Sequence, residues 1–181
     1  MVEMRVQGLA VDPQSKERVV ILTDMNEIRF LPIWIGVYES EAILLALENI
    51  KVPRPTTHDL MKSVALNLGA TLERIVIHTV DDMTATYYAK LVLVKEGSLE
   101  PLVEVDARPS DAIALALRFQ APIFVTEAIL SQPDVAMDKE KVNKDIAEFK
   151  KFLADVKPSD FDRYDRAHGE KPRDDSDGEA K

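Results

Sequence analysis

Residues 108–117 read RPSDAIALAL, and residues 38–47, seventy positions earlier, read YESEAILLAL. Both stretches share a serine, an acid, Ala-Ile and a closing Leu-Ala-Leu in the same register. A serine that caps free backbone N–H groups, followed by an acid at the positive end of the helix dipole, predicts that helices begin at Ser40 and Ser110. Apolar residues then fill every position from 112 to 117. We therefore expect both helices to be largely buried, with their alanines letting neighbours approach closely.

The same offset relates the segments around these two helices. In the first half, β-branched and apolar runs predict strands at 2–11, 19–22 and 28–35, then a helix at about 40–49 and a second one from Thr56 or Thr57 to Gly69. In the second half, strands are expected at 72–79, 87–94 and 102–107, followed by the Ser110 helix and a helix near 126–130. The sequence thus predicts an α+β fold with an internal duplication of a β-β-β-α-α unit.

These patterns also predict the domain boundaries. One domain is expected at 1–135, with repeats at approximately 1–69 and 70–135. A C-terminal amphipathic helical segment is expected at 136–161, and a disordered charged tail at 162–181, where apolar residues almost vanish. The stripe of the C-terminal helix consists of Val142, Ile146, Phe149, Leu153 and Val156.

Alternation along the third strand of each half predicts which side chains face the core. Ile33 and Ile35, with their counterparts Val103 and Val105, are expected to point inward. Trp34 then lies on the other face, where it covers a neighbouring element or a second subunit. In the helix after Thr57, four apolar residues share one face: Leu60, Met61, Val64 and Leu68.

Composition limits the classes of function. The 181 residues are 46% hydrophobic, enough for a proper core, and the formal net charge is -9 with a pI near 4.9. An acidic chain does not bind nucleic acid by counterion release over its whole surface, so any such contact needs a local basic or metal-neutralised site. There is no cysteine, and no apolar run approaches the roughly 20 residues of a membrane helix. We expect a cytoplasmic protein without membrane contact.

Polar side chains gather where the predicted helices begin. Clustered carboxylates with a histidine or arginine suit a divalent ion and water for phosphodiester cleavage. The candidate catalytic residues are His58, Asp59, Asp106, Asp111 and Glu127. The candidate substrate-binding residues are Arg54 and Arg108, and the candidate metal ligands are Glu41, Asp59 and Asp111, with magnesium or manganese as the ion.

The same residues also have a purely structural interpretation. Ser40, Ser110, Thr57 and Thr126 suit helix caps, and acids are common in first helical turns. Asp106 and Arg108 can form an ion pair that closes a loop. At this level both interpretations stay open.

Three motifs stand out in the chain: LPIWIG at 31–36, RPTTHDL at 54–60 and DARPSDAIALA at 106–116. Together they resemble the bifunctional nuclease family of bacteria and plants, and the resemblance covers roughly the first 130 residues. It implies a nuclease acting on both RNA and DNA, and an α+β domain that forms a homo-oligomer. It brings no established catalytic residues, so the candidate site above comes from the residues alone.

Two hypotheses from different classes follow. The first is a metal-assisted nuclease that contacts nucleic acid through a local site. The second is a non-catalytic homo-oligomeric binding or regulatory module. The second is favoured by the acidic charge, the missing catalytic signature and sheet faces that need covering.

Overall fold

The computed structural model describes residues 1–12, 15, 17–81, 83–95, 97, 101–132, 143–144, 146–148 and 151, with 101 and 102 described by backbone alone. The chain divides into two units, Met1–Phe149 and Lys150–Lys181, and all described residues except Lys151 belong to the first. The elements are β1 (Val2–Val11), β2 (Arg18–Asp24), β3 (Phe30–Ile35), α1 (Val37–Leu47), α2 (Thr57–Asn67), β4 (Ala70–Asp81), β5 (Thr86–Lys95), β6 (Pro101–Ala107), α3 (Pro109–Phe119), β7 (Ile123–Val125) and α4 (Glu127–Leu130).

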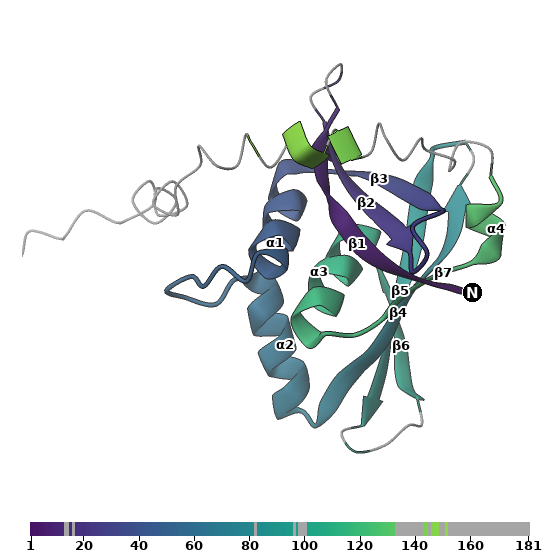
Figure 1. Cartoon of the computed structure of the whole chain (residues 1–181). Helices are drawn as coiled ribbons and strands as arrows, with labels where there is room; N and C mark the ends of the chain where they lie inside the picture. The colour runs from purple at the N-terminus through teal and green to yellow at the C-terminus, as the bar shows by residue number, and fades with distance from the viewer. Residues whose placement is uncertain are drawn as a thin grey trace, which may run out of the picture. The chain divides into compact units, whose positions relative to one another are not determined.

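The seven strands form one sheet in the order β3-β2-β1-β7-β4-β5-β6 (Figure 1). Hairpin-like antiparallel pairs build β1-β2-β3 and β4-β5-β6. The short strand β7 joins the two groups, antiparallel to β1 and parallel to β4. The predicted α+β class is therefore confirmed.

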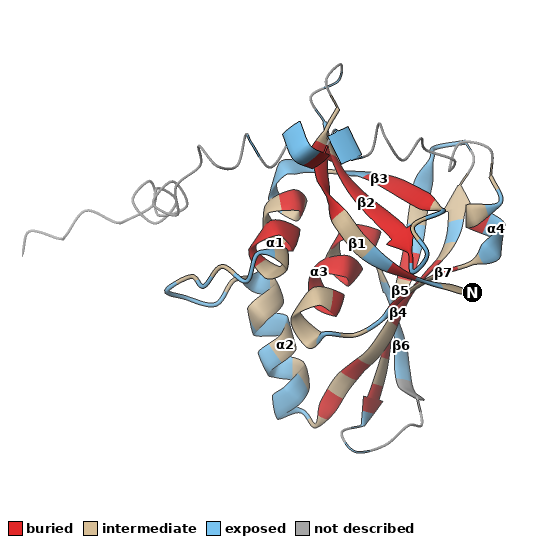
Figure 2. Ribbon diagram, viewed as in Figure 1, coloured by how far each residue is buried: buried red, intermediate tan, exposed pale blue. Residues whose placement is uncertain are grey.

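Helix α3 is the centre of the core. Seven of its residues are buried, and it packs against α1, α2, β4 and β5. Figure 2 shows this buried helix between the strands and the helices α1 and α2, of which α2 is largely exposed or half-buried. Alanines at 112, 114 and 116 leave almost no exposed surface, as expected where a neighbouring backbone approaches closely.

Strand β2 is apolar on both faces because both faces are covered. One face packs against α1. On the other, Ile146 joins Ala10, Val19, Ile21 and Phe30 in a buried cluster. Side chains buried on two sides explain why β2 reads as a continuous apolar run instead of an alternating one.

The predicted helix starts at Ser40 and Ser110 were wrong. Helix α1 begins at Val37, after the N-cap Gly36, and α3 begins at Pro109, after the N-cap Arg108. Proline suits the first helical position because its φ is already helical and its missing N–H needs no partner there. Ser40 lies inside α1, where its hydroxyl donates to the Val37 carbonyl at 2.7 Å.

Helix α2 follows the prediction at both ends. Thr56 caps it with a reciprocal capping box to Asp59, and Gly69 follows its end at a φ of +73°. Thr56 takes the capping place that had been assigned to Thr57, whereas Thr126 is the N-cap of α4 as predicted.

The predicted inward direction of Val103 and Val105 was wrong, because both are exposed on the edge strand β6. An edge strand has a neighbouring strand on one side only, so its side chains are less covered than those of a central strand. In β3 the prediction holds better: Ile33 is buried, Ile35 is half-buried and Trp34 is exposed.

The internal duplication stays a prediction. Both halves begin with three strands and a helix, but the second half then inserts β7 and ends in α4, a helix of four residues where α2 has eleven. Of the predicted C-terminal helix, Ile146 is buried, while Val142, Phe149, Leu153 and Val156 lie outside the described residues, as does the tail at 162–181. Among the described helices, none is long and apolar enough to cross a membrane.

Candidate functional site

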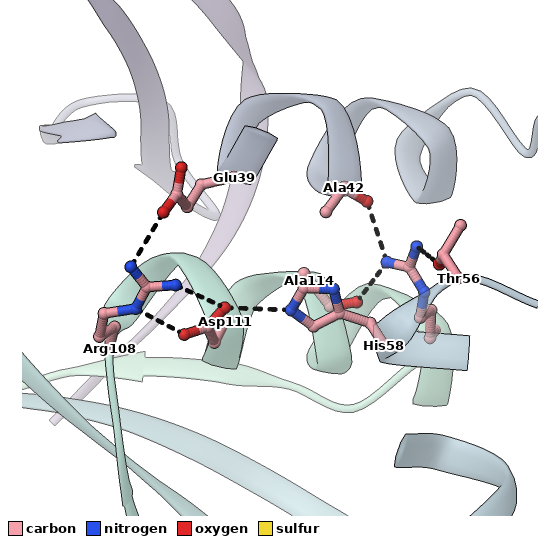
Figure 3. A network of polar contacts seen from close by, with 8 residues as sticks. Glu39, Ala42, Thr56, His58, Arg108, Asp111 and Ala114 are labelled. Atoms are coloured by element: carbon pink, nitrogen blue, oxygen red, sulfur yellow. Dashed lines mark hydrogen bonds and ion pairs between the residues drawn. The ribbon is translucent and has the colours of Figure 1, made fainter. Parts of the chain in front are cut away.

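The first turns of α2 and α3 meet through a histidine and an aspartate. His58 Nε2 lies 3.1 Å from Asp111 Oδ1, although the two residues are 53 positions apart in the chain (Figure 3). The capping box at Thr56 begins α2 just before His58, and Pro109 begins α3 just before Asp111. Local capping signals thus place both side chains at helix starts.

Arg108 stands on the outer side of this pair. Its Nε donates to Asp111 Oδ2 at 2.7 Å, and its Nη1 donates to Glu39 Oε1 at 2.9 Å (Figure 3). The Asp111 hydrogen bond, with help from Glu39, raises the pKa of Arg108. With 66% of its side chain exposed, Arg108 is a permanent cation that solvent and large ligands can reach.

Asp111 is ionised at neutral pH. Burial by itself raises the pKa of this carboxyl, but the hydrogen bonds from Arg108 and His58 outweigh burial and lower the pKa below 3.8. A carboxylate only accepts hydrogen bonds, so His58 donates through Nε2–H, and in the neutral form of the ring the lone pair is then on Nδ1. This tautomer is the basic form that a proton acceptor needs.

A second group of polar contacts surrounds Arg118, near the end of α3. Its Nε donates to Asp59 Oδ1 at 2.7 Å, and Nη1 donates to the carbonyls of Ala42 and Ala114, both at 2.9 Å. Only 7% of the Arg118 side chain is exposed. Asp59 is therefore the counter-ion of a buried arginine that ties three helices together.

Both oxygens of Asp59 are engaged. Oδ1 accepts from Arg118, while Oδ2 accepts from the Thr56 amide at 2.9 Å and from its hydroxyl at 2.7 Å. Burial raises the pKa of Asp59, but these hydrogen bonds together lower it below 3.8. The contacts favour the structural interpretation of Asp59.

The structure does not bring the other predicted catalytic residues to His58. Glu127 pairs with Arg29 at 3.1 Å, and Arg29 also binds Asp24, so these three form a separate group. Asp106 lies on β6 opposite Lys90. Its side chain points to the opposite face of the sheet from that of its neighbour Ala107, the last residue before Arg108. It does not form the predicted ion pair with Arg108, which binds Asp111 and Glu39 instead.

The predicted metal ligands do not converge either. Glu41 is half-buried on α1, where burial raises its pKa although Arg18 opposes the shift. Asp59 and Asp111 each bind a different arginine. Among the residues that the structure describes, no three His, Asp or Glu side chains form a metal-binding group. These side chains therefore do not fit the predicted ion.

Of the two predicted phosphate-binding arginines, Arg108 joins the site. Arg54 is exposed in the loop before α2. Sequence analysis assigned no role to Arg118 or Glu39. Arg118 carried a signal, since it is the first basic residue after the apolar run of α3, and a charge beside such a run needs a partner when the helix is buried. Glu39 is one of the polar residues that gather near the start of the first helix, but an acid there is ordinary and does not mark it as a site residue.

Comparison with known proteins gives one family. The model of the bifunctional nuclease domain matches residues 20–138. An uncharacterised protein of Mycobacterium tuberculosis is 38% identical over 169 residues, which cover 89% of this chain and 98% of that protein.

Plant proteins match over a shorter range. Bifunctional nuclease 1 of Oryza sativa subsp. indica is 30% identical over 118 residues, 65% of this chain and 35% of the plant protein. Bifunctional nuclease 2 of Arabidopsis thaliana is 32% identical over 97 residues, 54% of this chain and 29% of that protein. The similarity thus covers about a third of each plant protein.

Proposed function

Because the chain belongs to the bifunctional nuclease domain family, we propose that it cleaves phosphodiester bonds in RNA and DNA at the site of His58, Asp111 and Arg108. The observation that carries the proposal is the 3.1 Å contact between His58 Nε2 and Asp111 Oδ1, beside an exposed arginine. The names of the plant relatives support the class of activity.

The geometry suggests a role for each residue. Asp111 orients the imidazole and stabilises the positive charge that forms when Nδ1 accepts a proton from water or a hydroxyl. Arg108 neutralises the phosphate, whose oxygens suit the planar guanidinium. To reach Arg108, a phosphate competes with Glu39 for Nη1. No step in this scheme passes through a metal ion.

The test is cleavage of a labelled single-stranded RNA and of plasmid DNA by His58→Ala. General acid–base catalysis contributes about 100-fold or more, so we expect a loss of at least that size. His78→Ala is the matched control, because His78 lies on β4 and its ring contacts Thr79. Full activity in a folded His58→Ala protein would overturn the proposal.

Running each assay with magnesium, with manganese and with EDTA separates a metal-assisted reaction from one that uses His58 and Arg108 alone. The hypothesis of metal-assisted cleavage is kept only if EDTA removes the activity and added magnesium or manganese restores it.

A second candidate function is a homo-oligomeric binding module. The observation that favours it is the outer surface of α2, where apolar side chains face solvent: Leu60, Met61 and Val64, with Leu68 just after the helix. Exposed apolar patches of a few hundred Å² commonly mark interaction sites. The mass of the protein in solution tests this candidate, and a dimer or larger assembly is the expected result.

A further inference from the structure

Helix α2 is held in place mainly by polar contacts. None of its eleven residues is buried, although it packs against α3 and β4. Its large apolar side chains point outward, and its charged or titratable side chains point inward, to Asp111, Arg118 and Phe119. Hydrophobic packing therefore does little to fix where the first turn of α2 lies.

Arg118 supplies the contacts that fix it. Besides the Asp59 ion pair, its Nη2 donates to the Thr56 hydroxyl at 3.4 Å, and its carbonyl accepts from Lys62. Figure 3 shows Thr56 and the backbones of Ala42 and Ala114 around this network. The Arg118 side chain thus holds the capping residue and the capping acid of α2 against α1 and α3, while its backbone carbonyl holds the next turn through Lys62.

Two of the polar contacts between α2 and α3 join neighbouring residues of α2 to one face of α3. His58 and Asp59 are neighbours on α2, whereas their partners Asp111 and Arg118 are seven residues apart on α3. Seven residues are about two turns and about 10 Å, so both partners lie on the same face of α3. The first turn of α2 is anchored at two separate points, and in each pair one side chain is nearly buried, Arg118 at 7% exposed and His58 at 12%.

We propose that Arg118 is a positioning residue for the proposed reaction, because it holds His58 within hydrogen-bonding distance of Asp111. The inference rests on the proposed function, but its geometric core is independent of any activity. Without Arg118, the first turn of α2 moves, and His58 no longer keeps its proton on Nε2 opposite Asp111. A shift of about 1 Å in a catalytic group costs about 100-fold in rate.

The experiment is ¹H–¹⁵N NMR of the imidazoles in ¹⁵N-labelled protein, with the His58 signal identified by its loss in His58→Gln. The wild type is expected to show His58 with the proton on Nε2. In Arg118→Met, the His58 signals are expected to shift to those of a solvent-exposed, tautomer-averaged histidine. Arg118→Lys is expected to retain part of the wild-type signature because it keeps the charge.

Arg29→Met is the matched control. Arg29 also pairs with a buried aspartate, Asp24, and with Glu127, but it has no described contact with α2. It controls for a general loss of an ion pair. Its His58 signals and cleavage rate are expected to match the wild type, while Arg118→Met loses about 10–100-fold in kcat with little change in KM.

Wild-type His58 signals in a folded Arg118→Met protein would overturn the inference, and so would an equal disturbance by Arg29→Met. If Arg118→Met does not fold, Arg118→Lys and Asp59→Asn make the same test from the two sides of the ion pair. A wild type without cleavage would end the proposed function, whereas the NMR result still decides the role of Arg118.

Discussion

Two carboxylates at neighbouring helix starts, Asp59 and Asp111, are both held ionised by arginines, yet their surroundings give them different roles. Asp111 pairs with an arginine that is 66% exposed and also accepts a hydrogen bond from His58. Asp59 pairs with an arginine that is 7% exposed, and its second oxygen accepts the hydrogen bonds of a capping box. The exposure of the partner, more than the acid itself, separates the candidate catalytic carboxylate from the structural one.

The lowered pKa of Asp59 predicts how stability depends on pH. Its folded-state pKa lies below the ordinary 3.8, so the ionised carboxylate stabilises the fold above pH 3.8. This contribution is lost as the pH falls through the folded-state value. Asp59→Asn is therefore expected to lower stability by about 2 kcal/mol at pH 7, a fall of about 4–8 °C in Tm.

The measurement is thermal unfolding of wild type and Asp59→Asn at pH 7 and near pH 3. The gap between the two proteins is expected to narrow at the lower pH, because below pH 3.8 the carboxyl of Asp59 is protonated in the unfolded chain and the wild type progressively loses this contribution. A gap that stays constant over this range would show that ionisation of Asp59 does not contribute.

At the scale of elements, Ile146 covers one face of the N-terminal strands, and the sequence pattern alone did not identify which residue would do so. Strand β1 carries a bulge between Val6 and Gly8, which resets the pairing so that Gly8 lies opposite Ile21. A side chain on Gly8 would meet Ile146 Cγ2 at 3.0 Å. The glycine leaves room for Ile146 to sit on the outer face of the β1-β2 pair.

Ile146→Ala is expected to destabilise the protein by at least about 2 kcal/mol, because it removes a buried side chain from this cluster. Ile28→Ala removes the same atoms from a position that is largely exposed, so it is expected to change stability by less than about 0.5 kcal/mol. Denaturant unfolding of both variants is the measurement. Equal effects would mean that Ile146 does not stabilise the sheet in solution.

At the scale of the whole molecule, net charge and apolar surface act in opposite directions. A formal charge of -9 keeps copies of the chain apart, whereas the outer surface of α2 offers an uncharged place where two copies can meet. Half of a standard interface is about 800 Å², and its centre is more apolar than its rim. The α2 surface suits such a centre.

Val64→Glu is expected to lower the solution mass to that of a monomer, because it places a charge in the middle of this surface. Met83→Glu is the control, since Met83 is also exposed but lies in the turn between β4 and β5. Sedimentation velocity at micromolar concentration measures the mass. A monomeric wild type, or the same mass in both variants, contradicts this candidate interface.

Local signals in the sequence determined the elements. The apolar runs predicted all three N-terminal strands, the Thr56 and Gly69 signals predicted both ends of α2, and the run at 112–117 predicted that α3 is buried. These features depend on residues a few positions apart, so a pattern in one segment is enough to specify them. The helix starts at Ser40 and Ser110 were missed because Pro109 and Gly36 outweighed the serines.

Only the tertiary structure decided which side chains meet. The gathering of polar residues at helix starts predicted that His58, Asp111 and Arg108 belong to the candidate site, but Glu127 and Asp106 had equal claims. The choice depends on how α2 lies against α3, and that position is set by Arg118, a residue 59 positions from its partner Asp59. A polar contact across such a distance has no local pattern, because its energy appears only when both helices are in place. The orientation of α2 was also decided only by the tertiary structure. Its sequence specifies an apolar face, but Asp59 and His58 bind partners on α3, so the apolar face lies toward solvent.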